Sequence, residues 1–237
     1  MSTSSPNNAS TSLRDRPGPA LAVAAFALLL AGVALAFWWA PIDADQGFSQ
    51  KIFYIHVPVA FTAYACFGWG AWKALRLLWR DEERYDLESY TAIHLGTIFG
   101  VLTLVTGSLW AKYSWGIWWS WGERQLVVFL ILFLFYSAYF MLRYSIDPGP
   151  RRARISAVYA LFGVVLIPIS FLAIRILGTI FHPAVFTRDG PQMSASMFGT
   201  FLVCLAGMLA LGFALYHTEL AGKRLDQRLK QLRKALA

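Results

Sequence analysis

The chain has 237 residues, of which 57% are hydrophobic and only 14% charged, and its formal net charge is +8. A soluble domain carries about 25% charged residues. Here the charges stand in short blocks between long apolar runs, which excludes a sizeable soluble domain. Because runs near 20 residues can cross a bilayer core of about 30 Å, the composition predicts an all-α polytopic membrane protein.

Residues 1–19 are rich in Ser, Asn, Thr and Pro, which predicts a disordered tail. The apolar run that follows is too long for the core of a cleavable signal peptide and is therefore expected to be the first span. Six spans are predicted at about 20–40, 57–78, 89–111, 125–142, 155–177 and 192–216, within a membrane domain covering 20–217. Pro168 predicts a kink in the fifth span. The basic segment 218–237 has leucines at heptad-like spacing, typical of a helix that lies on anionic lipid or docks a cytoplasmic subunit.

Lysine and arginine are distributed unevenly between alternate loops. Sixteen of the 21 fall near residues 14–16, 73–84, 143–154 and 223–234, and only five fall in the other loops. Because cytoplasmic loops are enriched in Lys and Arg, both termini are predicted to be cytoplasmic. The three outer loops are then about 41–56, 112–124 and 178–191.

The outer loop between the third and fourth spans carries four of the ten tryptophans within seven residues. This tryptophan tract contains Trp115, Gly116, Trp118, Trp119, Trp121, Gly122 and Glu123. It is interpreted either as a lipid anchor or as a platform for a flat apolar ligand. At helical spacing the first three tryptophans are expected to share one face, with the fourth pointing elsewhere. The two glycines leave backbone bare, so that a ligand can approach closely.

Two of the four histidines, His56 and His182, are predicted at the outer surface, one in each of the other outer loops. Imidazole nitrogen is a good ligand for haem iron, and indole faces can sandwich a porphyrin. Each histidine alone could equally be a hydrogen-bonded residue of the membrane interface. The pair, placed on either side of the tract, favours iron ligation. His94 and His217 are predicted at the inner surface, away from any dense aromatic cluster.

A porphyrin carries two propionates, which call for cationic partners on the same side. Arg124 directly follows the tract, and Arg175 lies near the outer end of the fifth span, where a charge is expensive and often functional. Further cations expected there are Lys51, Lys112 and Arg188. Glu123 could hydrogen-bond a ligand or pair with Arg124.

Absent motifs narrow the function. No Walker motif, HExxH or GxSxG occurs, so the sequence predicts no ATPase, protease or esterase site of its own. No histidine lies within the middle of a span, which argues against electron-transfer haem inside the bundle. Cys66 and Cys204 form no CxxC or CxxCH motif and are expected to be free thiols. The alternatives are a channel or transporter, which would need charged residues in the middle of the membrane, and a ligand-free assembly subunit that uses the tract for docking.

The tract resembles the "WWD" motif of the haem-handling family of cytochrome c maturation. The segment 46–58, reading QGFSQKIFYIHVP, is similar to the opening of the CcmC members of that family. The resemblance extends over 41–217 and includes six spans and the order histidine, tract, histidine. Two features depart from the pattern: Gly122 stands where the motif usually has Asp, with Glu123 next, and the surroundings of His182 match more loosely than those of His56.

This resemblance implies that haem b is held at the outer face by His56 and His182, over the tract, with Arg124 as the trailing arginine of the motif. It implies transfer of the haem to a periplasmic chaperone of the CcmE type. It also implies a complex with ATP-binding-cassette subunits of the CcmA and CcmB types and a small single-span subunit of the CcmD type, in a bacterial inner membrane, with the haem site facing the periplasm. We expect a haem-transfer protein without enzymatic activity and without a nucleic-acid partner.

Overall fold

The computed structural model describes residues 19–183, 185–187 and 189–236. In chain order the elements are α2 (Pro19–Ala34), η2 (Leu35–Trp39), η3 (Phe48–Ile52), α3 (Phe53–Arg80), α4 (Arg84–Trp115), α5 (Arg124–Tyr144), α6 (Pro150–Val164), α7 (Leu166–Leu177), β1 (Phe186–Thr187), β2 (Gly190–Pro191) and α8 (Ala195–Leu236). Within these residues, six helical segments are long and apolar enough to cross a membrane. The predicted all-α fold with six spans is confirmed.

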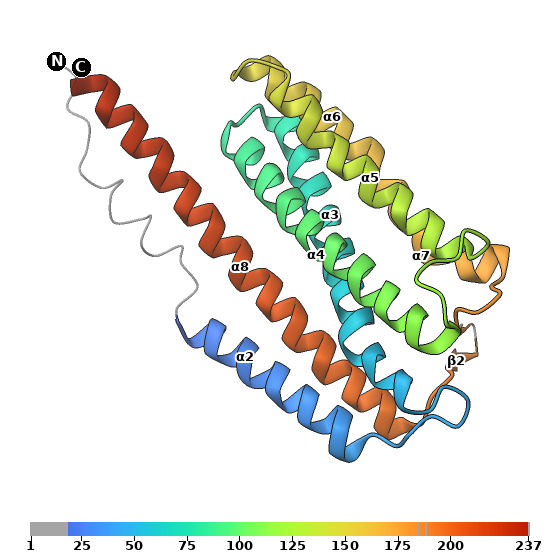
Figure 1. Cartoon of the computed structure of the whole chain (residues 1–237). Coiled ribbons are helices and arrows are strands. Elements are labelled where there is room, and N and C mark those ends of the chain that lie inside the picture. Colours follow the sequence, from blue (N-terminus) through green and yellow to red (C-terminus); the bar gives the residue numbers. More distant parts are fainter. Residues whose placement is uncertain (1–18, 184, 188, 237) are drawn as a thin grey trace.

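The spans form an elongated bundle in which α3 packs along α4, while α2 lies against α8 (Figure 1). Phe67 of α3 stacks on Tyr136 of α5, with ring centroids 4.0 Å apart. Gly96 of α4 faces the same phenylalanine, and a Cβ added there would lie 2.6 Å from its ring. Small residues at such contacts let membrane helices approach closely. A second core cluster, around Tyr54 and Phe201, joins α3 to α8 and to η2.

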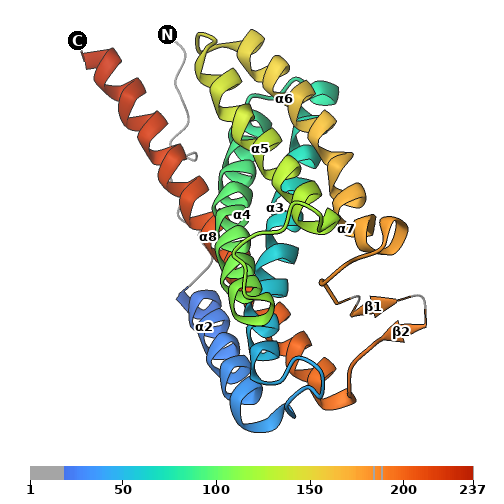
Figure 2. The ribbon, with the colours of Figure 1, turned by 45° about the vertical axis from the view of Figure 1, so that its right-hand side comes forward.

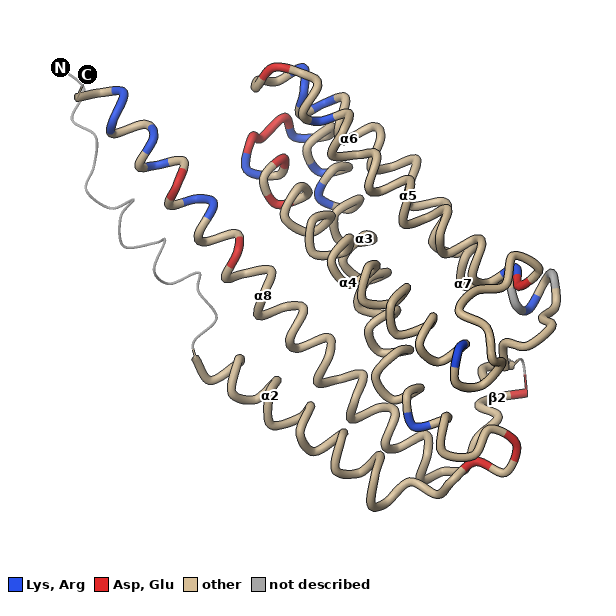
Figure 3. The backbone as a smooth tube through the Cα atoms, in the orientation of Figure 1, with Lys and Arg blue, Asp and Glu red and all other residues tan. Residues whose placement is uncertain are grey.

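The two ends of the bundle differ in charge (Figure 3). The basic end, as we call the end where α3 meets α4, is held by ion pairs. Arg143 donates two hydrogen bonds to the Asp86 carboxylate, at 2.7 and 2.6 Å. Lys73 and Arg224 both contact Glu88, at 2.8 and 2.9 Å. The opposite end, which we call the tract end, carries the tryptophan tract. A cytoplasmic position of both termini stays a prediction.

The fifth span is broken at Val165, which separates α6 from α7. Pro168 lies one turn later; a proline ring has no N–H and clashes with the carbonyl four residues back. The predicted kink is therefore confirmed. Beyond the break, α7 leads to the short β1–β2 hairpin, in which Phe186 pairs with Pro191 (Figure 2).

The last helix, α8, is one element of 42 residues that runs without interruption through the basic tail. The tail is thus a continuation of the sixth span, and Leu225, Leu229 and Leu232 are exposed along it. Contact of these leucines with anionic lipid or with a cytoplasmic subunit stays a prediction. Cys66 and Cys204 are free thiols, as predicted. Residues 1–18 of the predicted disordered tail lie outside the described residues.

Candidate functional site

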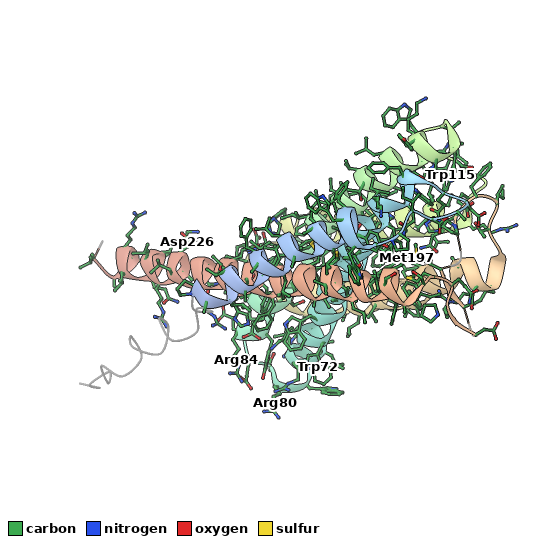
Figure 4. The ribbon with its side chains drawn as sticks, turned by 90° about the horizontal axis from the view of Figure 1, so that it is seen from below. Trp72, Arg80, Arg84, Trp115, Met197 and Asp226 are labelled. Atoms are coloured by element: carbon green, nitrogen blue, oxygen red, sulfur yellow. The ribbon has the colours of Figure 1, made fainter. Side chains whose placement is uncertain are left out.

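The three loops predicted on the outer side come together at the tract end. Trp115 of α4 and Met197 of α8 lie toward this end, whereas Asp226 lies toward the other (Figure 4). His182 follows α7 on a loop, as predicted. His56 is not on a loop: it is the fourth residue of α3, because the helix begins at Phe53 rather than Val57. One of the two histidines therefore sits on a rigid element and the other on a loop.

Three cavities meet at His56 and His182, and both side chains line all three. The first, of about 260 Å³, also contains Trp110, Asp43 and Met197 in its wall. The second, of about 70 Å³, is lined by Trp110 and by tryptophans of the tract. The third, of about 90 Å³, is lined by Arg175. The predicted convergence of His56 and His182 at the tract is thus present in the fold, although His56 comes from the first turn of α3 and only His182 from a loop.

The hydrogen bonds of His56 define which of its nitrogens is free. Its Nδ1 lies 2.9 Å from the Thr106 hydroxyl oxygen. That hydroxyl has a single proton, which it donates to the carbonyl of Leu102 at 2.7 Å. The threonine oxygen must therefore accept from Nδ1–H, and Nε2 keeps its lone pair. A partner that fixes one ring nitrogen in this way is typical of metal-binding histidines.

His182 has the same arrangement with a different partner. Its Nδ1 lies 3.3 Å from the carbonyl oxygen of Pro183, an atom that can only accept, so Nδ1 carries the proton and Nε2 does not. Its ring packs edge-on against Trp110 and Trp115, with centroids 5.4 and 6.5 Å apart. Burial among these rings lowers the pKa of His182, although the Pro183 carbonyl and the Glu123 carboxylate oppose the shift. A neutral imidazole with a free Nε2 is the form that binds a metal.

The tract does not have the predicted helical face. Helix α4 ends at Trp115, because Gly116 adopts a left-handed conformation with φ of 75° and closes the helix. The following tryptophans lie on an irregular segment. Trp118 is 56% exposed and Trp121 74% exposed, and Trp119 packs edge-on against Trp121 at 5.7 Å. Of the four, Trp115 and Trp119 line the cavity with the histidines, whereas Trp118 and Trp121 are exposed and do not line it.

Trp110 is a site residue that the sequence reasoning missed. It lies on α4 before the tract, is buried, and lines two of the three cavities together with both histidines. Gly107, one turn earlier, faces His56: a Cβ added there would lie 2.9 Å from Cε1 of the imidazole. A signal was present in the run of small residues from Thr106 to Ser108 near the outer end of a span, where room for another side chain is needed.

The predicted cations lie in different surroundings. Arg175 is exposed, donates to the Phe171 carbonyl at 2.7 Å, and lines a cavity with both histidines. Arg124 is exposed at the first position of α5. Lys51 is buried, and its ammonium donates to the carbonyls of Ala40 and Pro41 at 2.6 and 3.2 Å. It therefore ties the first outer loop together and is engaged within the fold.

Two predicted cations remain, Lys112 and Arg188. Lys112 donates to the Gly116 carbonyl at 2.9 Å and so supports the end of α4. Arg188 lies outside the described residues.

Glu123 is fully buried, and its carboxylate accepts hydrogen bonds from the loop that carries His182. Oε2 accepts from the backbone N–H groups of Ile180, Phe181 and His182, at 3.1, 2.8 and 3.3 Å. Burial alone would raise the pKa of Glu123, but these three hydrogen bonds outweigh it and leave the pKa below its usual value. The carboxylate is therefore ionised, and it connects the tract to the third outer loop.

The polar side chains around the cavities suit a metal complex better than a bare metal ion. Within the described residues, no cluster of three or more His, Cys, Asp or Glu side chains could hold a metal ion. A bare ion needs three or four protein ligands, so two histidines suit a metal that brings its own equatorial ligands. Trp110 Nε1, Trp119 Nε1 and Gln125 Oε1 are buried without a hydrogen-bond partner and line the same cavity. Such atoms mark a place where a polar ligand or water is expected.

Comparison with known protein families shows which family the chain belongs to. Residues 1–235 match the family model CcmC, described as heme exporter protein C. The chain belongs to the CcmC family. The heme exporter protein C of Bradyrhizobium diazoefficiens is 35% identical over 211 residues, which are 88% of this chain and 77% of the relative. That of Haemophilus influenzae is 30% identical over 195 residues, 81% and 78% of the two chains.

A more distant relative is mitochondrial. A ccmC-like protein of Arabidopsis thaliana, named for cytochrome c biosynthesis, is 29% identical over 180 residues, which are 76% of this chain and 68% of the relative. The predicted membership of the CcmC family is thus confirmed.

Proposed function

We propose that this protein binds haem b at the tract end and presents it to a periplasmic haem chaperone of the CcmE type. The family of this chain is described as heme exporter protein C, and the chain has a role in haem handling for cytochrome c maturation. The single observation that carries the finer proposal is the convergence of His56 and His182 on the same three cavities, each with Nδ1 engaged and Nε2 free.

In this proposal His56 and His182 are the axial ligands of the iron, and Trp115, Trp119 and Trp110 provide the apolar wall. Gly116, which ends α4 with φ of 75°, keeps the backbone beside the wall free of a side chain. The two outward tryptophans, Trp118 and Trp121, form an exposed aromatic surface on which a docking chaperone can pack.

The charges around the cavities favour one orientation of the porphyrin. Asp43 and Asp45 line the first cavity and would repel propionates. Arg175 lines the third cavity, and Arg124 follows the tract. We therefore propose the propionates on the side of Arg175, with Arg124 as their second partner. Lys51 is excluded from this role because its ammonium is bound to backbone carbonyls.

The placement in the cell follows the charge pattern. Because Lys and Arg concentrate at the basic end, that end is proposed to face the cytoplasm of a bacterial inner membrane, with the haem site on the periplasmic side. The proposed partners are ATP-binding-cassette subunits of the CcmA and CcmB types and a small single-span subunit of the CcmD type. The chain itself is proposed to act by holding and releasing haem, without an ATPase site or catalytic residues of its own.

The test is an absorption spectrum of the purified protein after addition of haem. The expected result is a six-coordinate bis-histidine spectrum that is lost in the His56→Ala, His182→Ala double variant. The matched control is the His94→Ala, His217→Ala double variant, which removes the two histidines on α4 and α8 that are away from these cavities. A wild type that binds no haem, or a double variant of the site with the wild-type spectrum, would refute the proposal.

A further inference from the structure

Glu123 stands at the start of α5, but its side chain does not cap that helix. It is the N-cap residue, with an extended backbone, and its side chain makes no capping hydrogen bond. An N-cap carboxylate ordinarily accepts from the N–H groups of its own first turn. Here the first turn is served by the Glu123 backbone carbonyl, which accepts from Leu126 and Val127. The carboxylate is free to reach another segment, and it is fully buried there.

That other segment is the loop of His182. Three consecutive N–H groups, from Ile180 to His182, point at a single carboxylate oxygen, which is the arrangement of an anion-binding nest. The Thr179 hydroxyl lies 3.1 Å from the other oxygen and donates to the His182 carbonyl at 2.7 Å. The loop has no regular secondary structure at these positions. The backbone of the loop is therefore held at three consecutive amides by one buried carboxylate.

Gly122 lies beside the loop that the carboxylate reaches. A Cβ added to Gly122 would lie 3.2 Å from Cδ1 of Ile180, so the Ile180 side chain packs on the bare backbone of this glycine. The carboxylate of the next residue reaches the amides of the same loop.

We propose that Glu123 is the positioning residue for His182: it holds the third outer loop on the tryptophan tract so that the imidazole faces His56 across the haem cavity. The proposal rests on the proposed function, because it concerns the second axial ligand. In this role Glu123 contacts neither the iron nor the porphyrin. His56 sits on α3 and needs no such support, so the two ligands differ in how firmly they are held, and His182 is the one that can be released by freeing a loop.

The first experiment measures the loop without haem. Hydrogen exchange of the peptide covering residues 178–183 is compared in wild type, Glu123→Ala and Glu123→Gln. The alanine variant is expected to exchange the three amides about tenfold faster or more, because the local opening loses its closing contact. The glutamine variant, which keeps the shape and one acceptor, is expected to lie between. Asp147→Asn, which removes an exposed carboxylate at the basic end, is the matched control and should leave this peptide unchanged.

The second experiment measures the ligand. Haem-loaded Glu123→Ala is expected to change from a six-coordinate to a five-coordinate spectrum, with haem affinity about 10- to 100-fold weaker, as is usual for loss of an orienting partner. Exogenous imidazole should restore the six-coordinate spectrum, as it should in His182→Ala. If the alanine variant does not fold, Glu123→Gln carries the test through a partial loss of the six-coordinate form.

The outcomes separate the two proposals. Exchange at wild-type rates in the alanine variant overturns the positioning role, and so does faster exchange combined with an unchanged haem spectrum. A wild type that binds no haem refutes the proposed function instead. In that case the exchange measurement still decides whether Glu123 holds the loop.

Discussion

A single added methyl group offers a sharp test of the site geometry. Gly107→Ala places a Cβ on α4 at 2.9 Å from Cε1 of His56, so the ring must retreat by about 0.5 Å to reach the 3.4 Å of an ordinary contact. The ring is held on Nδ1 by Thr106 at 2.9 Å. A retreat of this size stretches that hydrogen bond to as much as about 3.4 Å, beyond the usual 2.7–3.2 Å, and so weakens it. The free energy of haem binding should become less favourable by about 1 kcal/mol, which raises the dissociation constant about fivefold.

The stability of the fold should change little. Alanine is favoured over glycine in a helix interior by about 1 kcal/mol, which offsets the weakened Thr106 hydrogen bond, so Gly107→Ala should unfold at about the wild-type temperature. Gly68→Ala on α3 is the matched control, because nothing lies within 4 Å of its added Cβ. The assay is a haem titration in detergent micelles, followed at the Soret band, together with thermal unfolding. Haem affinity equal to wild type in Gly107→Ala would refute the placement of His56 against α4.

Three further substitutions test other contacts. Thr106→Val keeps the side-chain shape but removes the acceptor for His56; haem affinity should fall about tenfold, and an unchanged titration would contradict the tautomer assignment. Gly96→Ala forces a Cβ to within 2.6 Å of the Phe67 ring; overpacking should destabilise the fold by about 1–3 kcal/mol, measured by thermal unfolding against Gly68→Ala. Asp86→Ala leaves a buried arginine of α5 without its carboxylate; the expected cost is about 3 kcal/mol, and a wild-type melting temperature would show that the pair is dispensable.

Much of the fold could be predicted because hydropathy and charge act over long stretches of the chain. The six spans and the break near Pro168 follow from the length of apolar runs and from the missing N–H of proline. The helix ends were less accurate. Helix α3 begins four residues before the predicted Val57, so His56 is helical rather than on a loop.

The site was predicted in outline and missed in detail. Three outer loops must meet at one end of a bundle with six antiparallel spans, which brings His56 and His182 toward the tract. The helical face of tryptophans was wrong, because the prediction continued α4 past Gly116, although a glycine at this position is a common helix stop. The role of Glu123 could not be read locally, since its partners belong to a loop two spans later along the chain.

The length of α8 has a mechanical consequence. At 1.5 Å per residue, its 42 residues make a rod of about 63 Å with no hinge in it. One end contributes Met197 to the wall of the cavity at the histidines, and the other continues past Glu219, which pairs with His94, as the basic tail. Anything that binds the basic tail is therefore joined to the wall of the cavity by one continuous helix, with no loop between them.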